Sequence, residues 1–414
     1  MNNIFPNKSP IPLQCVPPSE ESSGRTSALA RFRVLVAGLC ALVLSVGLAR
    51  FAYTPMLPQM RDQAGLSVDM GGWLATSNYA GYMVGAFVMA NTKTLETKFK
   101  LYRAGLIVAL LTTVLMGFTE SAVVWAVLRF LSGLSSTAGL LLASGLVLNW
   151  LMVNGHKPEL GVHFTGMGIG IIVSGVAVEA MSGWVDWAGM WKGLGALGAA
   201  FFLLAWFWMP SPTSVLAVQA AGVMPSPSRR WKTILAWAYL CAGYGYVVSA
   251  TFIVDLVHNL PSLANLGNWV WVVVGLAAMP TSYVWDRLVH RYGIIPALGF
   301  AYALQICSFL LPVMGLGSVG LVVSAVMFGG TFVGIVSLTL ALIGRYHPVN
   351  PAKAMARLTL SYGAAQVLGP VVTAYLTSYS GSYNSALIAA ALVMLLGSGL
   401  LMWLIRLPVN EPHG

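Results

Sequence analysis

Long apolar runs recur along the whole chain and are separated by short polar stretches. A run of about 20 apolar residues is the length that an α-helix needs to cross the hydrocarbon core of a bilayer. Twelve runs of about that length or longer occur, at residues 34–58, 69–91, 101–118, 122–152, 160–181, 188–209, 233–257, 266–285, 293–312, 316–343, 355–379 and 383–405. The eighth and eleventh are the weakest, because Gly, Pro or polar residues interrupt them. The pattern predicts an all-α membrane protein with twelve transmembrane helices.

The longest polar interruption divides the twelve runs into two sets of six. It covers residues 210–232, contains four prolines and four serines, and ends in a basic cluster. A linker between two equal sets is typical of transporters built from two related halves. We therefore expect an N-terminal six-helix half at 31–209 and a C-terminal six-helix half at 233–407. Residues 1–30 would form a disordered cytoplasmic tail, and residues 408–414 a second cytoplasmic tail.

Charged residues are scarce and fall mainly on one side of the predicted helices. They make up 8% of the chain, whereas 57% of the residues are hydrophobic; a soluble domain has about 25% charged residues. If the N-terminus is cytoplasmic, 18 of the 22 Lys and Arg residues lie on that side, and only Arg61 and Lys192 lie on the other. Cytoplasmic loops carry such an excess of basic residues. We therefore expect both termini in the cytoplasm, with the net charge of +10 setting orientation and contacting lipid headgroups.

Several other classes of protein are disfavoured by the residue pattern. The four cysteines are scattered and none pairs at metal-ligand spacing, so we expect no disulfide, no metal and no other cofactor. The basic residues are too dispersed for a nucleic-acid site. No clustered His/Asp/Glu or Ser/His set indicates an enzyme, and no loop is long enough for a sensor or scaffold. The expected partners are the lipid bilayer and a small-molecule solute, and the expected state is a monomer.

Arg50 places a permanent charge inside the first apolar run. An arginine at the centre of a membrane helix costs at least about 2.5 kcal/mol, so it normally faces a wet cavity or a partner. If the helix stops at Pro55, Arg50 lies near the outer face and its side chain can reach the interface. If the helix continues, Arg50 lies near the middle. We expect Arg50 and Tyr53 to face a solute, and the alternative is a structural pair with Asp255 or Glu179.

Other polar side chains fall at similar depth. For Arg129, in the fourth run, two interpretations are open: solute contact, or a structural tie to a backbone carbonyl or to Glu179. Asn78 and Tyr82 share a face of the second run by their spacing, and packing between helices is the alternative for the amide. The remaining candidates for solute binding are Tyr244, Tyr246 and Gln366.

Several short motifs resemble the major facilitator superfamily. The segment "PTSYVWDRLVHRYG" is similar to the cytoplasmic D-R-x-x-x-R element of that superfamily, at Asp286, Arg287 and Arg291. Arg129 with Gly133 matches its R-x-x-x-G element. More narrowly, "RFAYTPMLP", "NYAGYMVGA", "HFTGMGIGI" and "AAQVLGP" resemble the YbfB/YjiJ branch of bacterial facilitator-type transporters.

The resemblance implies a fold and a mode of action. It implies two six-helix halves that alternate access to a midplane cavity lined by helices 1, 4, 7 and 10, with the D-R-x-x-x-R loop acting as a gate. The expected function is proton-coupled secondary transport of a small organic solute across the bacterial inner membrane. Two cations without clear internal partners favour an anionic solute. The alternative is a proton-driven exporter of amphiphilic compounds.

Overall fold

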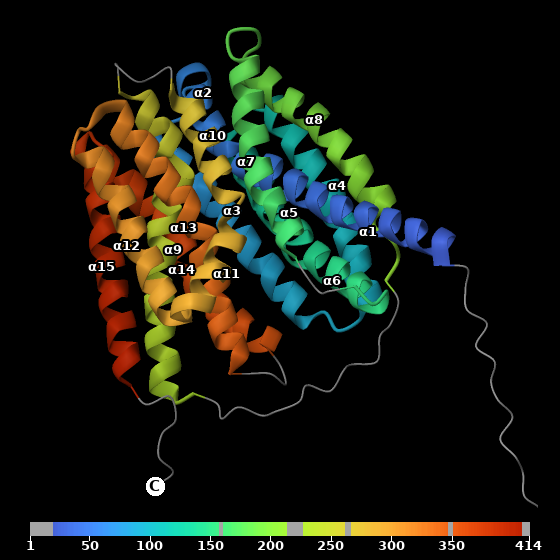
Figure 1. Cartoon of the computed structure of the whole chain (residues 1–414). Helices are drawn as coiled ribbons and strands as arrows, with labels where there is room; N and C mark the ends of the chain where they lie inside the picture. The colour runs from blue at the N-terminus through green and yellow to red at the C-terminus, as the bar shows by residue number, and fades with distance from the viewer. Residues whose placement is uncertain (1–19, 157–159, 213–226, 261–265, 347–350, 408–414) are drawn as a thin grey trace, which may run out of the picture.

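The computed structural model describes residues 20–156, 160–212, 227–260, 266–346 and 351–407 (Figure 1). All regular secondary structure in these ranges is helical. Much of the expected N-terminal tail (1–19), the middle of the expected linker (213–226) and the expected C-terminal tail (408–414) lie outside the described residues. The first helix begins at Glu20, before the boundary expected at residue 31, and the ninth begins at Arg229, inside the expected linker.

The helices form two groups along the chain. The N-terminal group consists of α1 (Glu20–Leu42), the π-helical segment η1 (Val43–Phe51), α2 (Tyr53–Ala64), α3 (Val68–Asn91), α4 (Leu95–Leu115), the 3₁₀ turn η2 (Met116–Phe118), α5 (Ala122–Thr137), the π-helical segment η3 (Ala138–Ala143), α6 (Ser144–Val153), α7 (Gly161–Met181) and α8 (Trp187–Trp208). The C-terminal group consists of α9 (Arg229–His258), α10 (Gly267–Ala278), α11 (Thr281–Tyr292), α12 (Ile294–Val313), α13 (Gly317–Arg345), α14 (Pro351–Ser380) and α15 (Asn384–Arg406).

Nine helices among the described residues are long and apolar enough to cross a membrane, and they cover nine of the twelve apolar runs. The other three runs correspond to α3, to α14 and to the pair α10–α11. The helices α3 and α14 are less apolar because they pack on each other through small and polar groups: Thr76 donates to the carbonyl of Val367 at 2.8 Å, and Gly72 lies against Pro370. Pro280 separates the short α10 from α11.

Local sequence accounts for several helix ends. The side chains of Ser67, Thr94 and Asp186 each accept a backbone N–H from the first turn of the helix that follows. Such side chains replace partners that the first turn of a helix lacks. Gly65 ends α2 in the left-handed region, with φ of 66°, which glycine adopts without steric cost.

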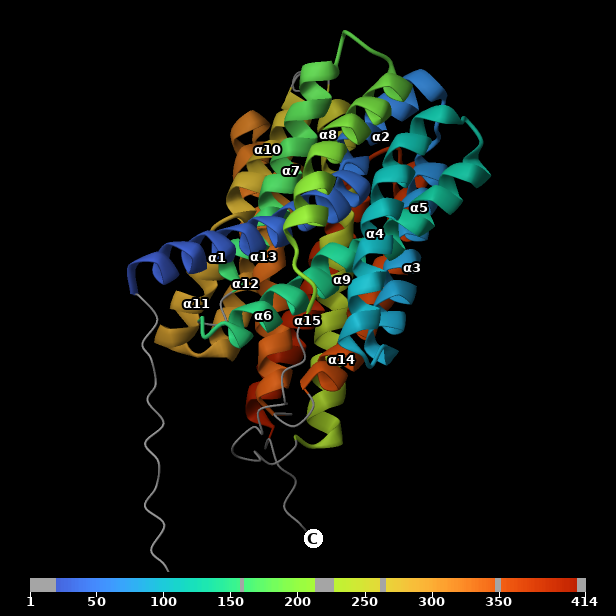
Figure 2. The same ribbon diagram turned by 90° about the vertical axis from the view of Figure 1, so that its right-hand side faces the viewer.

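The two groups lie side by side, and three helix pairs make most of the contact between them. Figures 1 and 2 show the N-terminal group in blue to green and the C-terminal group in yellow to red. Across the boundary α3 packs on α14, α7 packs on α10, and α2 packs on α9. Both views show α1 strongly inclined to the other helices, and it packs on α7 and α8 of its own group. The first helical span, Ala28–Ala64, is 37 residues long, about 55 Å, so it must tilt or bend within a bilayer.

Candidate solute-binding and gating sites

The segment that holds Arg50 lies deep inside the protein and is irregular. Every residue from Cys40 to Pro58 is buried. The backbone is π-helical from Val43 to Phe51 and continues as helix to Ala64, so the helix does not stop at Pro55. Arg50 therefore lies well inside the first span. This is the second of the two positions considered for it, in a helix that continues beyond Pro55. π-helical segments within α-helices are often found at functional sites.

The side chain of Arg129 ties α5 to the π-helical segment. Its guanidinium donates to the carbonyls of Ala49 at 3.1 Å and of Arg50 at 3.3 Å. The hydroxyl of Ser132 donates to the same Ala49 carbonyl at 2.8 Å. The ring of Tyr53 lies under the guanidinium, with its centre 4.3 Å from the central carbon. Of the two interpretations for Arg129, these contacts match the structural tie to backbone carbonyls.

Asn78 joins α3 to α5. Its amide nitrogen donates to the carbonyl of Arg129 at 2.9 Å and to the hydroxyl of Ser132 at 2.8 Å. A Cβ atom on Gly133 would meet the carbonyl of Asn78, so a glycine is needed at this crossing. The R-x-x-x-G spacing thus lets α3 approach α5 closely, and the amide contacts match the alternative of packing between helices.

The guanidinium of Arg50 is buried among rings. The side chain is 6% exposed, and its central carbon lies 4.7 Å from the ring centre of Tyr79 and 4.6 Å from that of Tyr82. Each ring face attracts a cation. Among the described residues, Arg50 forms no ion pair with a carboxylate, and its Nε has no hydrogen-bond partner. A buried charge without a counter-ion is costly in free energy unless another group pairs with it.

The two acids considered as partners for Arg50 are engaged elsewhere. Asp255 is fully buried and forms an ion pair with Arg61 at 2.5 Å. It also accepts a hydrogen bond from the hydroxyl of Tyr383. Glu179 accepts a hydrogen bond from the amide of Asn268 at 2.9 Å. Neither acid forms the structural pair with Arg50 that the sequence left open.

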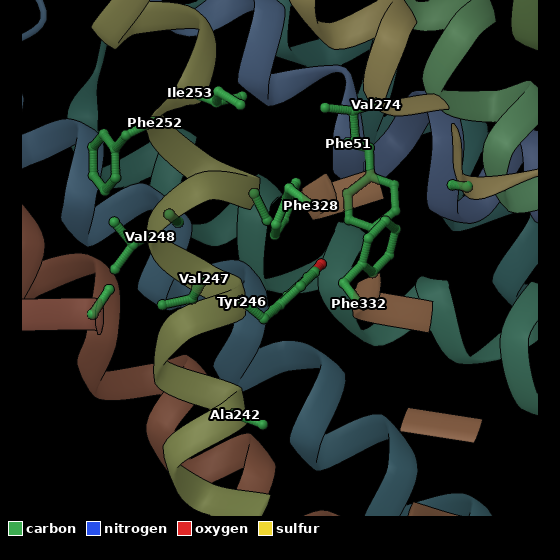
Figure 3. Packing of buried hydrophobic residues seen from close by; sticks show 14 of the residues in the cluster. Phe51, Ala242, Tyr246, Val247, Val248, Phe252, Ile253, Val274, Phe328 and Phe332 are labelled. Atoms are coloured by element: carbon green, nitrogen blue, oxygen red, sulfur yellow. The ribbon is translucent and has the colours of Figure 1, made fainter. Parts of the chain in front are cut away.

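Aromatic rings from both helix groups meet beside Arg50 and form what we term the central ring cluster. Its members are Phe51, Tyr79, Tyr82, Tyr246, Phe328, Phe332 and Tyr362. Tyr246 connects the two groups: its ring centre lies 6.3 Å from that of Tyr79 and 5.5 Å from that of Phe332. Figure 3 shows Tyr246 leaving α9 on the side that faces Phe51 and Phe332. No sequence signal marks Phe328 or Phe332, because a phenylalanine in an apolar helix is normally a packing residue.

The remaining candidates occupy different places. The hydroxyl of Tyr53, which we expected beside Arg50, donates to the carbonyl of Gly71 at 2.9 Å. Tyr244 is half-buried against Gly369 on α14 and takes part in none of the ring contacts among the described residues. Gln366 is 3% exposed, and its Oε1 has no hydrogen-bond partner there.

Polar contacts join the two groups at one end of the molecule, the end where α2 and α9 finish. Besides the pair of Arg61 with Asp255, these contacts include Asp62 to His258 at 2.7 Å, Thr54 to the carbonyl of Ala250 at 2.5 Å, and Ser378 to Asp69 at 2.8 Å. We call these four contacts the polar ties. All residues from Gly245 to Val257 are buried, so α9 is enclosed at this end.

The D-R-x-x-x-R element lies on helix α11, and our placement of it in a loop is wrong. Trp285 is buried and donates to the carbonyl of Gly330 at 2.7 Å, which holds one face of α11 on α13. Asp286, Arg287 and Arg291 are exposed on the other side. Arg287 donates to the hydroxyl of its neighbour on α11, Tyr283, at 2.5 Å. Within the described ranges, these three charged residues form no hydrogen bond or ion pair with the N-terminal group.

Comparisons with known proteins agree with this architecture. A family model described as "Uncharacterised MFS-type transporter YbfB" matches residues 42–402. The uncharacterised MFS-type transporter YceJ of Bacillus subtilis (strain 168) is 22% identical over 277 residues. That match covers 61% of this chain and 66% of the relative, just under two thirds of the relative's length.

Solved structures show a similar fold. The nucleoside transporter NupG has a TM-score of 0.71 at 13% identity, covering 92% of this chain and 100% of NupG. A bacterial homologue of the human lysosomal transporter Spinster, in an inward-facing and unoccupied conformation, has a TM-score of 0.66 at 14% identity. That match covers 91% of this chain and 97% of the homologue. At such low identity, the likeness concerns the fold alone.

Proposed function

We propose that this chain, which belongs to the YbfB family of MFS-type transporters, moves a small organic anion across the bacterial inner membrane by alternating access. The family and the fold support a secondary transporter. The anionic solute rests on one observation: the guanidinium of Arg50 is buried between the helix groups and has no carboxylate partner in the described part of the chain, while Asp255 and Glu179 are engaged elsewhere. A guanidinium recognises a carboxylate through two parallel hydrogen bonds.

The topology belongs to the same proposal. Twelve membrane helices in two six-helix halves, at 31–209 and 233–407, would place both termini in the cytoplasm. The charge distribution of the loops supports this orientation. Three runs are not long and apolar enough to count as membrane spans, for local reasons. The helices α3 and α14 carry polar contacts between the groups, and Pro280 interrupts the run that forms α10 and α11.

With this orientation, the polar ties lie on the outer side and hold it closed, so in this proposal the conformation is an inward-facing one. The exposed Asp286, Arg287 and Arg291 would then lie at the open cytoplasmic side, and they would engage the N-terminal half when that side closes. Coupling to protons is part of the proposal. Asp255 is a fully buried carboxylate whose side-chain partners come from both groups, so its pair with Arg61 helps to hold the outer side together.

Ligand binding tests the role of Arg50. The purified protein would be screened by thermal shift against organic acids and their neutral amides, since a ligand that binds the folded state raises its melting temperature. We expect acids to shift the melting temperature, Arg50→Lys to weaken the effect and Arg50→Ala to abolish it. Arg103→Ala is the matched control, because Arg103 also lies over two rings, those of Phe99 and Trp206, but on α4, away from the C-terminal group. Unchanged binding in Arg50→Ala would contradict the proposal.

The alternative, proton-driven export of amphiphilic compounds, is favoured by the central ring cluster, which offers apolar surface to such a solute. The same screen separates the two. A cationic amphiphile such as tetraphenylphosphonium would be repelled by a buried guanidinium without a counter-ion. Stabilisation by that cation, and not by acids, would favour export of amphiphiles over transport of an organic anion.

A further inference from the structure

The surroundings of Arg50 restrict the kind of anion that fits beside it. Tyr79 and Tyr82 lie around the guanidinium carbon, at 4.7 Å and 4.6 Å, and leave the Nε without a partner. The residues that continue the cluster from the other helix group are rings as well. Tyr246 has Phe328 at 6.2 Å, Phe332 at 5.5 Å and Tyr362 at 5.9 Å, measured between ring centres.

The polar groups of the central ring cluster are tyrosine hydroxyls, and the rest of its surface is ring. A small hydrated anion such as acetate or phosphate would lose its water shell there and regain hydrogen bonds only from Arg50 and the tyrosine hydroxyls. An anion that carries its own ring would instead bury that ring against Tyr246, Phe328 and Phe332. Aromatic pairs gain attraction beyond the area that they bury, in offset or edge-to-face arrangements like those already present in the cluster.

We propose that the solute is a flat aromatic carboxylate, held by its acid group on Arg50 and by its ring within the central ring cluster. This inference rests on the proposed function, because it assumes that Arg50 faces the solute. The ring-bearing residues come from both helix groups: Tyr79 lies on α3, and Tyr246 lies on α9. A solute that fills this place contacts both groups at once, so its binding is sensitive to how they are arranged.

Three matched probes test the inference on the purified full-length protein in lipid nanodiscs. Benzoate has both the ring and the charge, cyclohexanecarboxylate has the charge on a puckered ring, and benzamide has the flat ring without the charge. Dissociation constants would be measured by titration calorimetry. We expect benzoate to bind about tenfold more tightly than cyclohexanecarboxylate. We expect it to bind roughly 10- to 100-fold more tightly than benzamide, because hydrogen bonds to charged groups are the stronger ones.

A ring-deletion variant tests the place of binding. Phe332→Leu keeps an apolar side chain and removes a ring of the cluster that is not in contact with Arg50. It should weaken benzoate binding several-fold and leave cyclohexanecarboxylate binding unchanged. Phe99→Leu is the matched control, because Phe99 lies over Arg103 on α4, and this variant should bind all three probes like the native protein.

The outcomes separate the inference from the proposed function. Equal binding of benzoate and cyclohexanecarboxylate would overturn the aromatic solute and leave the anion transporter standing. Equal binding of benzoate and benzamide would overturn both. The inference is also wrong if none of the three probes binds, or if the only acid that binds has no aromatic ring and Arg50→Ala abolishes its binding. In either case, the wider screen of organic acids decides on the proposed function.

Discussion

Arg129 and Arg50 are both almost fully buried, but only Arg129 donates hydrogen bonds to backbone carbonyls. The carbonyls that it reaches, those of Ala49 and Arg50, belong to the π-helical segment, where the regular pattern of helix hydrogen bonds is altered. In a membrane interior, such carbonyls need partners from the protein. Arg129 therefore supports the backbone on which Arg50 is mounted.

This difference predicts opposite effects of the same substitution. Arg129→Gln should lower the free energy of unfolding by about 1–3 kcal/mol, because it leaves buried carbonyls without their donors. Arg50→Gln should change stability little or raise it, because the cost of burying a charge that has no described carboxylate partner offsets the attraction of the rings of Tyr79 and Tyr82, and it should abolish binding of acids. Melting temperatures in one detergent, with and without benzoate, measure both effects. A melting temperature of Arg129→Gln equal to that of the native protein would contradict the supporting role.

At the scale of elements, the crossing of η1 and α7 depends on two glycines. A Cβ atom on Gly47 would collide with the backbone of Gly170. Gly47→Ala should destabilise the protein by about 1–3 kcal/mol, the usual cost of overpacking. The matched control is Gly145→Ala on α6, where a Cβ would meet nothing within 4 Å, and the change should be neutral or slightly stabilising. Thermal melting compares the two variants, and equal melting temperatures would argue against a tight crossing.

The polar ties between α2 and α9 differ in depth, which predicts different effects on the tied end, the outer side in the proposed orientation. Arg61→Met leaves the buried Asp255 with Tyr383 as its only described partner, and breaking a buried pair in this way costs about 3–5 kcal/mol. We expect the outer side to open. The control is Asp62→Asn, because the pair of Asp62 with His258 is largely exposed and such pairs contribute about 0–1 kcal/mol.

A buried thiol reports this opening. Thr54 contacts the carbonyl of Ala250 on α9 and is 3% exposed, so Thr54→Cys, in a protein without its native cysteines, should react slowly with a membrane-impermeant thiol reagent. Arg61→Met should speed the reaction, and Asp62→Asn should not. Removing both charges, with Arg61→Met and Asp255→Leu together, should restore part of the stability lost in Arg61→Met alone. Equal labelling rates in all variants would show that the buried pair does not hold the outer side.

The sequence predicts helices well and their contacts poorly, for physical reasons. Each of the twelve apolar runs lies on one helix or on consecutive helical segments, because burial in lipid requires long apolar stretches. The pair of Arg61 with Asp255 joins residues 194 positions apart, and no local pattern encodes such a contact. The charged element at Asp286 was expected in a loop. It is helical because the same segment carries Trp285 on a face that packs on α13.

Seen as a whole, the molecule has two helix groups that are tied at one end and that touch mainly along three pairs of helices. The polar linker that predicts two halves carries no information on which end is tied, since this depends on how α2, α9, α3 and α14 meet in space. The closed end suggests a direct test of alternating access that needs no knowledge of the solute.

A bridge across the closed end should lock the molecule, whereas a bridge within one group should not. Asp69 on α3 and Ser378 on α14 are in hydrogen-bond contact across the boundary, and both are exposed. Replacing both with cysteine and joining them with a short reducible bis-thiosulfonate should slow hydrogen–deuterium exchange in α2 and in the end of α9 that packs on it, because the outer side then opens less often.

The control bridge joins Ser380 and Ser385, whose hydroxyls lie 2.7 Å apart within the C-terminal group at the same end. It adds the same reagent and the same two substitutions without crossing the boundary, so exchange in α2 and α9 should stay at the native rate. Reduction should return the Asp69–Ser378 protein to that rate as well. If both bridges slow exchange equally, the effect is local rigidity. If neither does, the two groups do not separate at this end, and alternating access through it is wrong.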